Sequence, residues 1–589
     1  MSEFVIDAES AADIAKFEVQ LSHYLAGELE EDVFRVFRLN NGIYGQRQGG
    51  HNQMIRIKAP YGTITATQLD RMADVATDYS RGWGHLTTRQ AIQFHFVQLE
   101  RIPDLLRDIA IVGLTSREAC GDTVRNVQGC HLAGACPSEV LDITPWAEAT
   151  FQHFLRNPLG QRLPRKFKIN FSGCATDCGQ AMFNDVGIIA TTRTNADGAL
   201  EAGFRVFIAG GLGANPHAAL ALEPFTAKED LLPTIESVLR VFEQTGNRDN
   251  KLRARMKWVV DNLGFDEVQR RVLAIRRFLL GSSTWPGGIP IEVIEAGDAP
   301  AGVSESVVAT PMGQGTPVVL RRPGAFERWE DSNVIRGAAK GTVSAIAYAR
   351  LGDVTSAQFR GLAAIVREYG VDIRVTNRQN FAIRNLEETQ LRTLFDRLTA
   401  IDMASPSAEL VSDVVSCPGA DTCNLAVTQS RGLADAIDLA LQAEGLAEVG
   451  GLRINISGCT NSCGQHHVAD IGFQGAERRA HGKSAPGYTM LLGGFVGDEK
   501  IEFGERATRL PAKAAPEAVV RVVRRFNDER IAGESFRGWI DRSGGVATLG
   551  ADLKQLDRFP TPDEGPDFYV DYDELGPYVA EVGASECAT

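Results

Sequence analysis

Long apolar segments are absent from this chain of 589 residues, and their absence narrows the class of protein. No run of about 18 uncharged apolar residues is available to cross a bilayer. The first ten residues, MSEFVIDAES, carry acids where a secretory signal would carry bases. The sequence therefore predicts a cytoplasmic protein that does not act in a membrane.

Cysteine and positive charge are also scarce. Ten cysteines are too few for a disulfide scaffold, so cysteines that occur in groups are candidates for metal or redox chemistry. The 61 basic residues are outnumbered by 75 acidic ones, and the net charge of −14 argues against nucleic acid as a partner, because phosphates need a basic surface. The last 27 residues hold eight acids and no Lys or Arg, which predicts an acidic C-terminal tail.

What the chain does contain is an internal repeat. Residues 169–188, INFSGCATDCGQAMFNDVGI, match residues 454–473, INISGCTNSCGQHHVADIGF, at ten of twenty positions. The TTRQ at 87–90 recurs as TNRQ at 376–379, at nearly the same offset. This spacing indicates two related halves. Residues 281–325, rich in Gly and Pro, are expected to link them.

Each half shows the same order of expected elements. An alternating strand precedes a turn, a helix follows at 66–79 or 356–369, and a strand runs through the TxRQ segment. A basic strand at 163–169 then leads into Ser-Gly-Cys and the start of a helix. Buried strands at 204–213 and 488–497 end in glycine loops, where bare backbone can approach a ligand. The pattern predicts a duplicated α+β (α/β-like) fold.

In the second half, four cysteines form two close pairs. Cys417 and Cys423 give C-x5-C, and Cys459 and Cys463 give C-x3-C about 35 residues later. Four thiolates are the ligand set of a cubane iron–sulfur cluster. Zinc matches less well because its cysteine pairs are usually closer, and four unrelated buried cysteines are the third interpretation. On a helix, Cys459 and Cys463 would lie one turn apart on one face.

These motifs resemble the siroheme-containing nitrite and sulfite reductase family over nearly the whole chain. The matching stretches are GIYGQRQGG (42–50), HLTTRQAIQFHF (85–96), GDTVRNV (121–127), LPRKFKI (163–169), SCPGADTCNLA (416–426) and SGCTNSCGQHHVADIGF (457–473). The resemblance implies that Cys417, Cys423, Cys459 and Cys463 bind a [4Fe-4S] cluster and that Cys463 bridges to the siroheme iron. It also implies a pseudo-twofold assembly of three domains, built with ferredoxin-like βαβ half-domains, and the cofactors at the junction of the three domains.

The expected domains follow from the repeat and this resemblance. They are a first ferredoxin-like half-domain with an N-terminal extension (1–110), a first siroheme and 4Fe-4S-type domain (111–280), the linker (281–325), a second ferredoxin-like half-domain (326–395), a second siroheme and 4Fe-4S domain (396–560) and the acidic tail (561–589).

The first half departs from the family because it also carries a complete cysteine set. Cys130 and Cys136 repeat the C-x5-C spacing, and Cys174 and Cys178 repeat the C-x3-C spacing. Two interpretations stay open: a second cluster, or buried thiols left over from the duplication. The remaining cysteines, Cys120 and Cys587, receive no function.

A cationic segment precedes the first SGC motif. On a strand, Lys166 and Lys168 would point to one face and Arg165 and Phe167 to the other, so two ammonium groups would converge on one spot. An iron that reduces an oxyanion needs such cations to hold the anion and to supply protons. A solvated charged edge is the alternative, but the segment runs straight into the apolar SGC strand.

The resemblance completes this set of oxyanion-binding cations. It implies Arg89 and Arg125 beside Lys166 and Lys168 as the residues that contact the substrate. Candidates for the siroheme carboxylates and ring are Arg56, Gln93, Arg165, Gly211 and Gly213. In the second half Arg378 and Arg453 align with Arg89 and Lys168, but Ser412 stands where Arg125 would be. One catalytic pocket is therefore expected.

The expected activity is the six-electron reduction of sulfite to sulfide, with nitrite reduction to ammonium at the same site as the alternative. The chain contains neither a P-loop nor a GxGxxG between strand and helix, so the reducing power would come from a ferredoxin or a separate flavoprotein subunit. NSCGQ…ADIGF resembles nitrite-type members, whereas HHV and residues 247–257 resemble sulfite-type members. Other classes are a non-catalytic iron–sulfur electron carrier without haem and a related enzyme of corrin biosynthesis.

Overall fold

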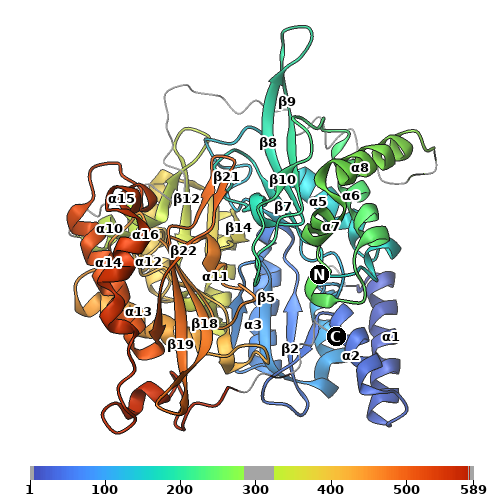
Figure 1. The fold of residues 1–589 in the computed structure, drawn as a ribbon. Coiled ribbons are helices and arrows are strands. Elements are labelled where there is room, and N and C mark those ends of the chain that lie inside the picture. Colours follow the sequence, from blue (N-terminus) through green and yellow to red (C-terminus); the bar gives the residue numbers. More distant parts are fainter. Residues whose placement is uncertain (1–4, 284, 286–323, 581–582, 584–589) are drawn as a thin grey trace.

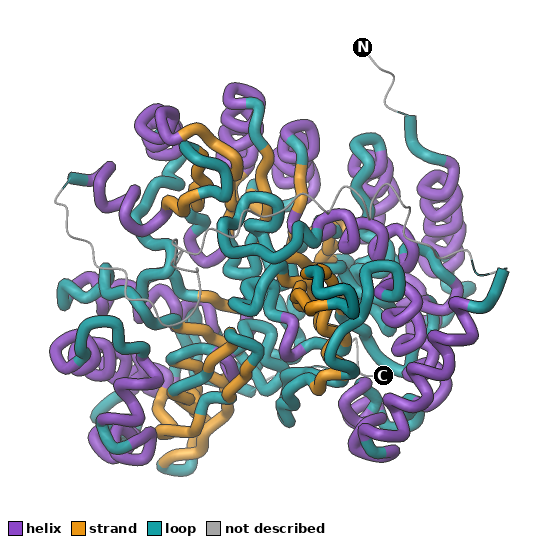
Figure 2. The backbone as a smooth tube through the Cα atoms, turned by 90° about the horizontal axis from the view of Figure 1, so that it is seen from above, coloured by secondary structure: helices purple, strands orange, loops and turns teal. Residues whose placement is uncertain are grey.

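The computed structural model describes residues 5–283, 285, 324–580 and 583. Most of the predicted linker and Cys587 lie outside the described residues. Within the described ranges, no helix combines the length and the apolar character that a bilayer crossing would need. Helices lie mostly at the periphery and strands toward the middle (Figures 1 and 2).

The two ferredoxin-like half-domains complete each other's sheets. The first sheet has the order β1 (Ile43–Gly45), β2 (Asn52–Ile57), β5 (Ile92–Gln98), β4 (Trp83–Leu86) and β13 (Asp353–Thr355). The second has the order β11 (Val334–Arg336), β12 (Thr342–Ala347), β15 (Phe381–Glu387), β14 (Asp372–Val375) and β3 (Thr63–Ile64). Each half thus gives one short edge strand to the other, β13 pairing with β4 and β3 with β14.

Two equivalent helices join these sheets at the centre of the molecule. Helices α3 (Ala66–Tyr79) and α11 (Ser356–Tyr369) begin and end where the sequence predicts. Each starts with a capping box, Thr65 with Gln68 and Thr355 with Gln358, which satisfies two backbone N–H groups that a helix start leaves free. The helices pack on each other (Figure 1). A single hydrophobic core therefore spans both half-domains.

The cysteine domains each contain a mixed sheet of the same design. The first has the order β10 (Leu220–Ala221), β9 (Leu200–Ile208), β8 (Val186–Thr194), β7 (Ile169–Ser172) and β6 (Gln128–Gly129). The second has the order β16 (Val415–Ser416), β17 (Ile454–Ser457), β18 (Ile471–Ala480), β19 (Lys483–Leu492) and β22 (Glu505–Pro511). A small hairpin of β20 (Phe495–Gly497) and β21 (Lys500–Glu502) follows β19. Each domain has its own hydrophobic core.

Helices cover the outer side of each half. In the first half these are α1 (Ala8–Leu25), α2 (Glu31–Asn40), α4 (Ile102–Ala110), α5 (Thr144–Phe154), α6 (Leu231–Thr245), α7 (Met256–Leu263) and α8 (Phe265–Leu280). In the second half they are α10 (Ala325–Asn333), α12 (Leu391–Thr399), α13 (Ser430–Ala443), α14 (Ala515–Glu529), α15 (Phe536–Arg542) and α16 (Gly545–Asp552).

The start of the predicted acidic tail packs on the second cysteine domain. The Asp571 carboxylate accepts a hydrogen bond from the backbone N–H of Gln429 at 2.9 Å, next to the start of α13. The Tyr578 hydroxyl donates to the Val427 carbonyl at 2.7 Å. These contacts hold the segment that follows Cys423, so this part of the tail supports a cysteine loop.

Three local predictions are wrong. The TxRQ segments do not continue a strand: they form the turns between β4 and β5 and between β14 and β15, where Gln90 and Gln379 adopt positive φ angles of 53° and 63°. No α-helix follows Ser-Gly-Cys in either half; each cysteine loop consists of turns and leads into one turn of 3-10 helix, Ala181–Phe183 or His466–Val468. The basic strand at 163–169 is reduced to one bridge between Val124 and Phe167 before β7 begins at Ile169.

Candidate functional site

The four cysteines of the second half are brought together by two parallel strands. Cys417 follows β16 and donates its backbone N–H to the Ile456 carbonyl of β17 at 3.2 Å. Cys459 lies two residues beyond the end of β17. The Gly458 N–H then donates to the Cys417 sulfur at 3.3 Å. The C-x5-C and C-x3-C segments therefore face each other across one pair of strands.

The thiols lie close enough to influence one another's ionisation. Burial raises the pKa of the Cys417 thiol, and the negative charge that Cys463 would carry raises it further. The same two causes raise the pKa of Cys423 to about 12 and that of Cys459 above its usual range. Thiols gathered in this way favour their neutral form unless a cation binds them, so the group suits a metal cluster.

The C-x3-C loop is shaped by left-handed residues rather than by a helix. Ser462 and Gln465 have φ angles of 55° and 63°. The N–H of Gly464 donates to the Ser457 hydroxyl at 3.0 Å, and a Cβ at this glycine would lie 2.1 Å from the Ile456 carbonyl oxygen. The loop therefore requires glycine at position 464. The left-handed residues on either side of it are incompatible with a helix, so the helix prediction is wrong here.

The first half reaches this loop from the other side. The Thr88 hydroxyl, in the TTRQ turn, donates to the carbonyl of Cys463 at 2.9 Å. Arg47 donates to the carbonyls of Ala420 and Ala426, which flank Cys423, at 3.1 and 3.2 Å. The TTRQ turn thus lies directly beside Cys463.

Arg89 occupies the next position in that turn. Its guanidinium donates to the side-chain oxygens of Asn170 and Asn184 at 3.2 and 3.3 Å and to the Asn126 carbonyl at 2.7 Å. Within the described part of the chain, no ion pair joins Arg89 to a carboxylate, and its Nε is buried without a partner. Burial and the nearby Arg125 lower the pKa of Arg89 to about 9. A half-buried cation that hydrogen-bonds only to neutral oxygens is suited to bind an external anion.

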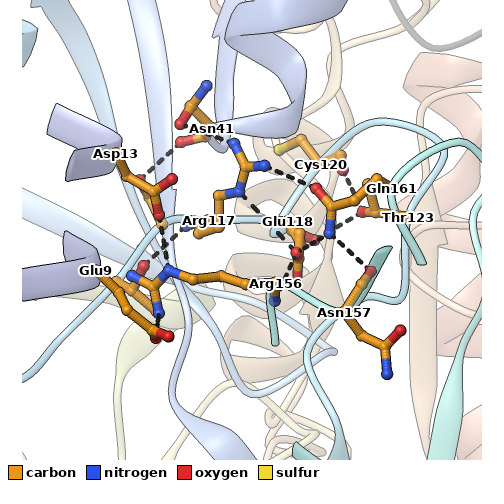
Figure 3. A network of polar contacts seen from close by, with 12 residues as sticks. Glu9, Asp13, Asn41, Arg117, Glu118, Cys120, Thr123, Arg156, Asn157 and Gln161 are labelled. Atoms are coloured by element: carbon orange, nitrogen blue, oxygen red, sulfur yellow. Dashed lines mark hydrogen bonds and ion pairs between the residues drawn. The ribbon is translucent and has the colours of Figure 1, made fainter. Parts of the chain in front are cut away.

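Arg125 is held by a tightly folded loop. Its guanidinium donates to the carbonyls of Gly121 at 3.1 and 2.7 Å and Ala119 at 3.0 Å. The preceding Glu118 is buried, accepts from the Arg156 backbone N–H at 2.9 Å and from Gln161, and its carbonyl accepts from Thr123 at 3.0 Å (Figure 3). This network fixes the loop that carries Arg125 against the N-terminal helices.

Lys166 and Lys168 lie on the other side of the backbone from Phe167. The Phe167 ring is fully buried and stacks on Phe242, with centroids 5.5 Å apart, whereas both lysines are partly exposed. Burial, then the positive charges of Arg89, Arg255 and Lys166, lower the pKa of Lys168 well below its usual value. The two lysines are thus close to each other and to Arg89. Arg165 instead pairs with Asp122 at 3.5 Å.

The other candidates surround this cluster. Arg56 on β2 pairs with Gln93 on β5, whose amide oxygen can accept from its Nε at 3.1 Å, and donates to the Ala119 carbonyl at 3.3 Å. Gly211 lies against Arg255, since a Cβ at Gly211 would be 3.4 Å from its Nη2. The Gly213 carbonyl lies 2.9 Å from His467 Nε2.

Two cations were missed by the sequence analysis. Arg255 forms a bidentate pair with the buried Asp185 at 3.0 and 2.7 Å, and Lys257 donates to the Leu212 carbonyl at 3.1 Å. Arg255 lowers the pKa of both Arg89 and Lys168, so it belongs to the same positive region. The basic run RARMK at 253–257 is the sequence feature that could have indicated these two cations.

In the second half, the equivalent arginines form ion pairs with carboxylates of the chain itself. Arg378 lies 3.2 Å from Asp413 and 3.4 Å from Glu409, and Arg453 lies 2.5 Å from Glu409. A cavity lies beside Arg378 and Arg453 and is also lined by Cys178. These two arginines are therefore held by carboxylates of the protein itself.

The arrangement defines what the site could hold. Four thiols and their glycine loop fit a [4Fe-4S] cluster, and the adjoining cations, with Arg89 Nε still unpartnered, fit a cofactor or substrate with several negative oxygens. Among the described residues, no group of three or more His, Cys, Asp or Glu side chains is arranged to hold a single metal ion.

Two models of protein domains match this chain. The model of the nitrite and sulphite reductase 4Fe-4S domain matches residues 120–277 and 407–547, and that of the nitrite/sulfite reductase ferredoxin-like half domain matches 44–110 and 338–401. An assimilatory ferredoxin-dependent nitrite reductase of Haloferax mediterranei is 29% identical over 525 residues, covering 85% of this chain and 84% of the relative. A sulfite reductase [ferredoxin] of Mycobacterium tuberculosis is 26% identical over 530 residues, covering 85% and 87%.

A solved structure shows the same architecture. The structure of the Mycobacterium tuberculosis NirA protein matches with a TM-score of 0.70 and 25% identity, covering 89% of this chain and 92% of that one. The duplicated α+β fold predicted from the sequence is thereby confirmed. The chain belongs to the nitrite and sulfite reductase family and is an oxidoreductase with an iron–sulfur cofactor.

Proposed function

We propose that this chain reduces sulfite to sulfide by six electrons at a siroheme coupled to a [4Fe-4S] cluster. The observation that carries the proposal is the group of cations beside the loop of Cys463, in which Arg89 meets no carboxylate partner among the described residues. A non-catalytic electron carrier has no need of such an anion site.

The chain's own residues would hold both cofactors. Cys417, Cys423, Cys459 and Cys463 are the proposed ligands of the cluster, and Cys463 is the proposed bridge to the siroheme iron. Arg56, Arg165, Gln93, Gly211 and Gly213 are the proposed contacts of the siroheme. When bound, the coupled pair supplies electrons one at a time to an oxyanion.

Four cations are proposed to act on the substrate. Arg89 and Arg125 orient its oxygens because a planar guanidinium can donate two parallel hydrogen bonds. Lys166 and Lys168 hold protons at their Nζ atoms for oxygens that leave as water. The lowered pKa of Lys168, caused by burial and by neighbouring cations, loosens its hold on that proton and suits this role.

Sulfite is favoured over nitrite by charge. Arg89 and Arg125 lie in one positive region with Lys166 and Lys168, and a dianion gains more from such a region than a monoanion does. Nitrite is the second candidate because the Haloferax relative bears that name. Both relatives are named for ferredoxin, which makes a ferredoxin the first candidate donor and a separate flavoprotein subunit the second.

Steady-state kinetics on both anions with one artificial donor, reduced methyl viologen, test the substrate. We expect a larger kcat/KM for sulfite; a much larger value for nitrite would reverse the order. A visible spectrum of the iron-replete protein tests the cofactor. A chain that binds iron and sulfide but shows no tetrapyrrole band would be an electron carrier and not a reductase.

A further inference from the structure

The first-half cysteines have no part in the proposed reaction, yet the fold brings them together as it does those of the second half. Cys136 lies close to Cys174, and Cys130 lies close to Cys178. Cys178 also interacts electrostatically with Cys174 and Cys136. None of them forms a disulfide, and Cys130 is only 5% exposed.

The backbone around these cysteines repeats that of the second quartet. Strands β6 and β7 pair in parallel in the same register as β16 and β17, Gln128 with Asn170 as Val415 with Asn455. Cys130 donates its N–H to the Phe171 carbonyl at 3.0 Å, as Cys417 does to Ile456 at 3.2 Å.

The C-x3-C loops of the two halves also agree in backbone conformation and in one hydrogen bond. Asp177 and Gln180 have φ angles of 56° and 60°, close to those of Ser462 and Gln465. The Gly179 N–H donates to the Ser172 hydroxyl at 3.0 Å, the distance found for Gly464 and Ser457. A Cβ at Gly179 would lie 1.9 Å from the Phe171 carbonyl oxygen, so the strained turn has been kept in both halves.

Backbone N–H groups meet the sulfurs at equivalent places. The Ser138 N–H contacts the Cys136 sulfur, and the Thr176 N–H contacts the Cys174 sulfur. Each donor lies two positions after its cysteine. In the second half, Cys423 and Cys459 receive the same contact from Leu425 and Asn461. Hydrogen bonds of this kind stabilise thiolates and the sulfurs of a bound cluster.

A buried cation beside the first quartet hydrogen-bonds only to neutral oxygens, and the carboxylates of Asp372 and Asp142 act on it from beyond ion-pair distance. Arg374 is 3% exposed; its guanidinium donates to the Cys130 carbonyl at 3.2 Å and to the Thr144 hydroxyl at 2.9 Å, and its Nε is buried without a partner. Within the described residues, no ion pair joins it to a carboxylate. A buried guanidinium needs a compensating charge, and four thiolates around an iron–sulfur core carry a net negative one.

Together these observations point to a second metal centre. We propose that Cys130, Cys136, Cys174 and Cys178 bind a second [4Fe-4S] cluster, so that the chain carries one cluster in each half. The four thiols lose their protons to solvent on binding, and the cluster can accept and return one electron. The proposal does not depend on which anion is reduced at the other cluster.

Metal and sulfide analysis of the anaerobically purified full chain tests this directly. Two clusters and one siroheme require about nine iron atoms and eight acid-labile sulfides per chain, whereas one cluster requires about five and four. We expect the larger pair of values, with siroheme quantified separately by extraction. Five irons and four sulfides in a siroheme-replete chain would overturn the proposal while leaving the reductase function intact, as would zinc in place of the additional iron.

Variants locate the additional iron. Cys174→Ser should lower iron and sulfide by about four each and leave the extracted siroheme unchanged, whereas the equivalent Cys459→Ser should lower both and also remove siroheme. Cys587→Ser, a cysteine outside both quartets, is the matched control and should change neither. Unchanged iron in a folded Cys174→Ser chain would contradict the assignment. If that variant does not fold, the values measured for the unmodified chain still decide between one cluster and two.

Discussion

Arg89 and Arg378 hold the same position in two copies of one turn, yet their surroundings differ. Arg89 donates to the side-chain amides of Asn170 and Asn184 and to a backbone carbonyl. Arg378 meets the carboxylates of Asp413 and Glu409. The duplication has therefore preserved the scaffold and changed the charge balance around it.

Three substitutions account for the difference. Asp413 stands where the first half has Asn126, Ser412 where it has Arg125, and Gly451 where it has Lys166. In the second half Arg378 and Arg453 are thus paired with carboxylates of the protein, whereas in the first half Arg89 donates only to neutral oxygens of the described residues. One scaffold gives a structural ion-pair network on one side and a candidate oxyanion site on the other.

The largest expected contrast comes from removing the two arginines in turn. Arg378→Met leaves the buried Asp413 without its arginine partner and Glu409 with Arg453 alone, and should lower the free energy of unfolding by about 3–5 kcal/mol. Arg89→Met removes contacts to the substrate and should lower kcat/KM by about 10- to 100-fold or more. Denaturant unfolding and steady-state kinetics on both variants measure the two effects. A large loss of kcat/KM in a folded Arg378→Met enzyme would contradict the expected difference between the two arginines.

The second-largest effect should come from replacing Arg125 by the residue that stands at the equivalent position of the second half. Arg125→Ser introduces the residue found at 412 and removes one charge-assisted contact, worth about 1.5–3 kcal/mol. We expect kcat/KM to fall by about 10- to 100-fold, and Arg125→Lys, which keeps the charge, to recover part of it. Equal kinetics in the Ser and Lys variants would mean that Arg125 supports the loop and does not bind the anion.

The smallest expected effect concerns pH and the second half. Burial by itself would raise the pKa of Glu409, but Arg453 and Arg378 outweigh it and lower this pKa to about 2, from an ordinary 4.5. The carboxylate therefore contributes stability above about pH 4.5 and loses it as the pH falls toward 2, a change of at most about 3 kcal/mol. Unfolding curves of the unmodified chain and Glu409→Gln between pH 6 and 3 should converge as the pH falls. Parallel curves would show that the pair contributes nothing.

The sequence predicted those elements whose signals are local. The bounds of α3 and α11 follow from capping boxes and apolar periodicity, and the cysteine spacing predicts how each quartet forms. The left-handed residues Gln90, Ser462 and Gln465 could not be foreseen, because glutamine and serine rarely adopt that conformation and tertiary contacts impose it.

Contacts between segments that are distant in the chain could not be predicted from the sequence either. Strand β3 has two residues and strand β13 three, too few for a periodic pattern, and they pair with partners from the opposite half. Arg255 joins the cation group through Asp185, which is 70 positions away in the chain. The burial of Phe167 between the partly exposed Lys166 and Lys168 fits the predicted alternation, although the strand itself is only a single bridge.

The most direct measurement compares Lys168→Met with Arg453→Met, since these residues are equivalent in the two halves. The dissociation constant for sulfite would be measured by absorbance titration of the cofactor-loaded enzymes. If only the first half binds the anion, Lys168→Met should raise this constant at least about 10-fold, while Arg453→Met should stay within about twofold and lower the melting temperature instead. An unchanged constant in Lys168→Met, or a larger loss in Arg453→Met than in Lys168→Met, would contradict a single oxyanion site in the first half.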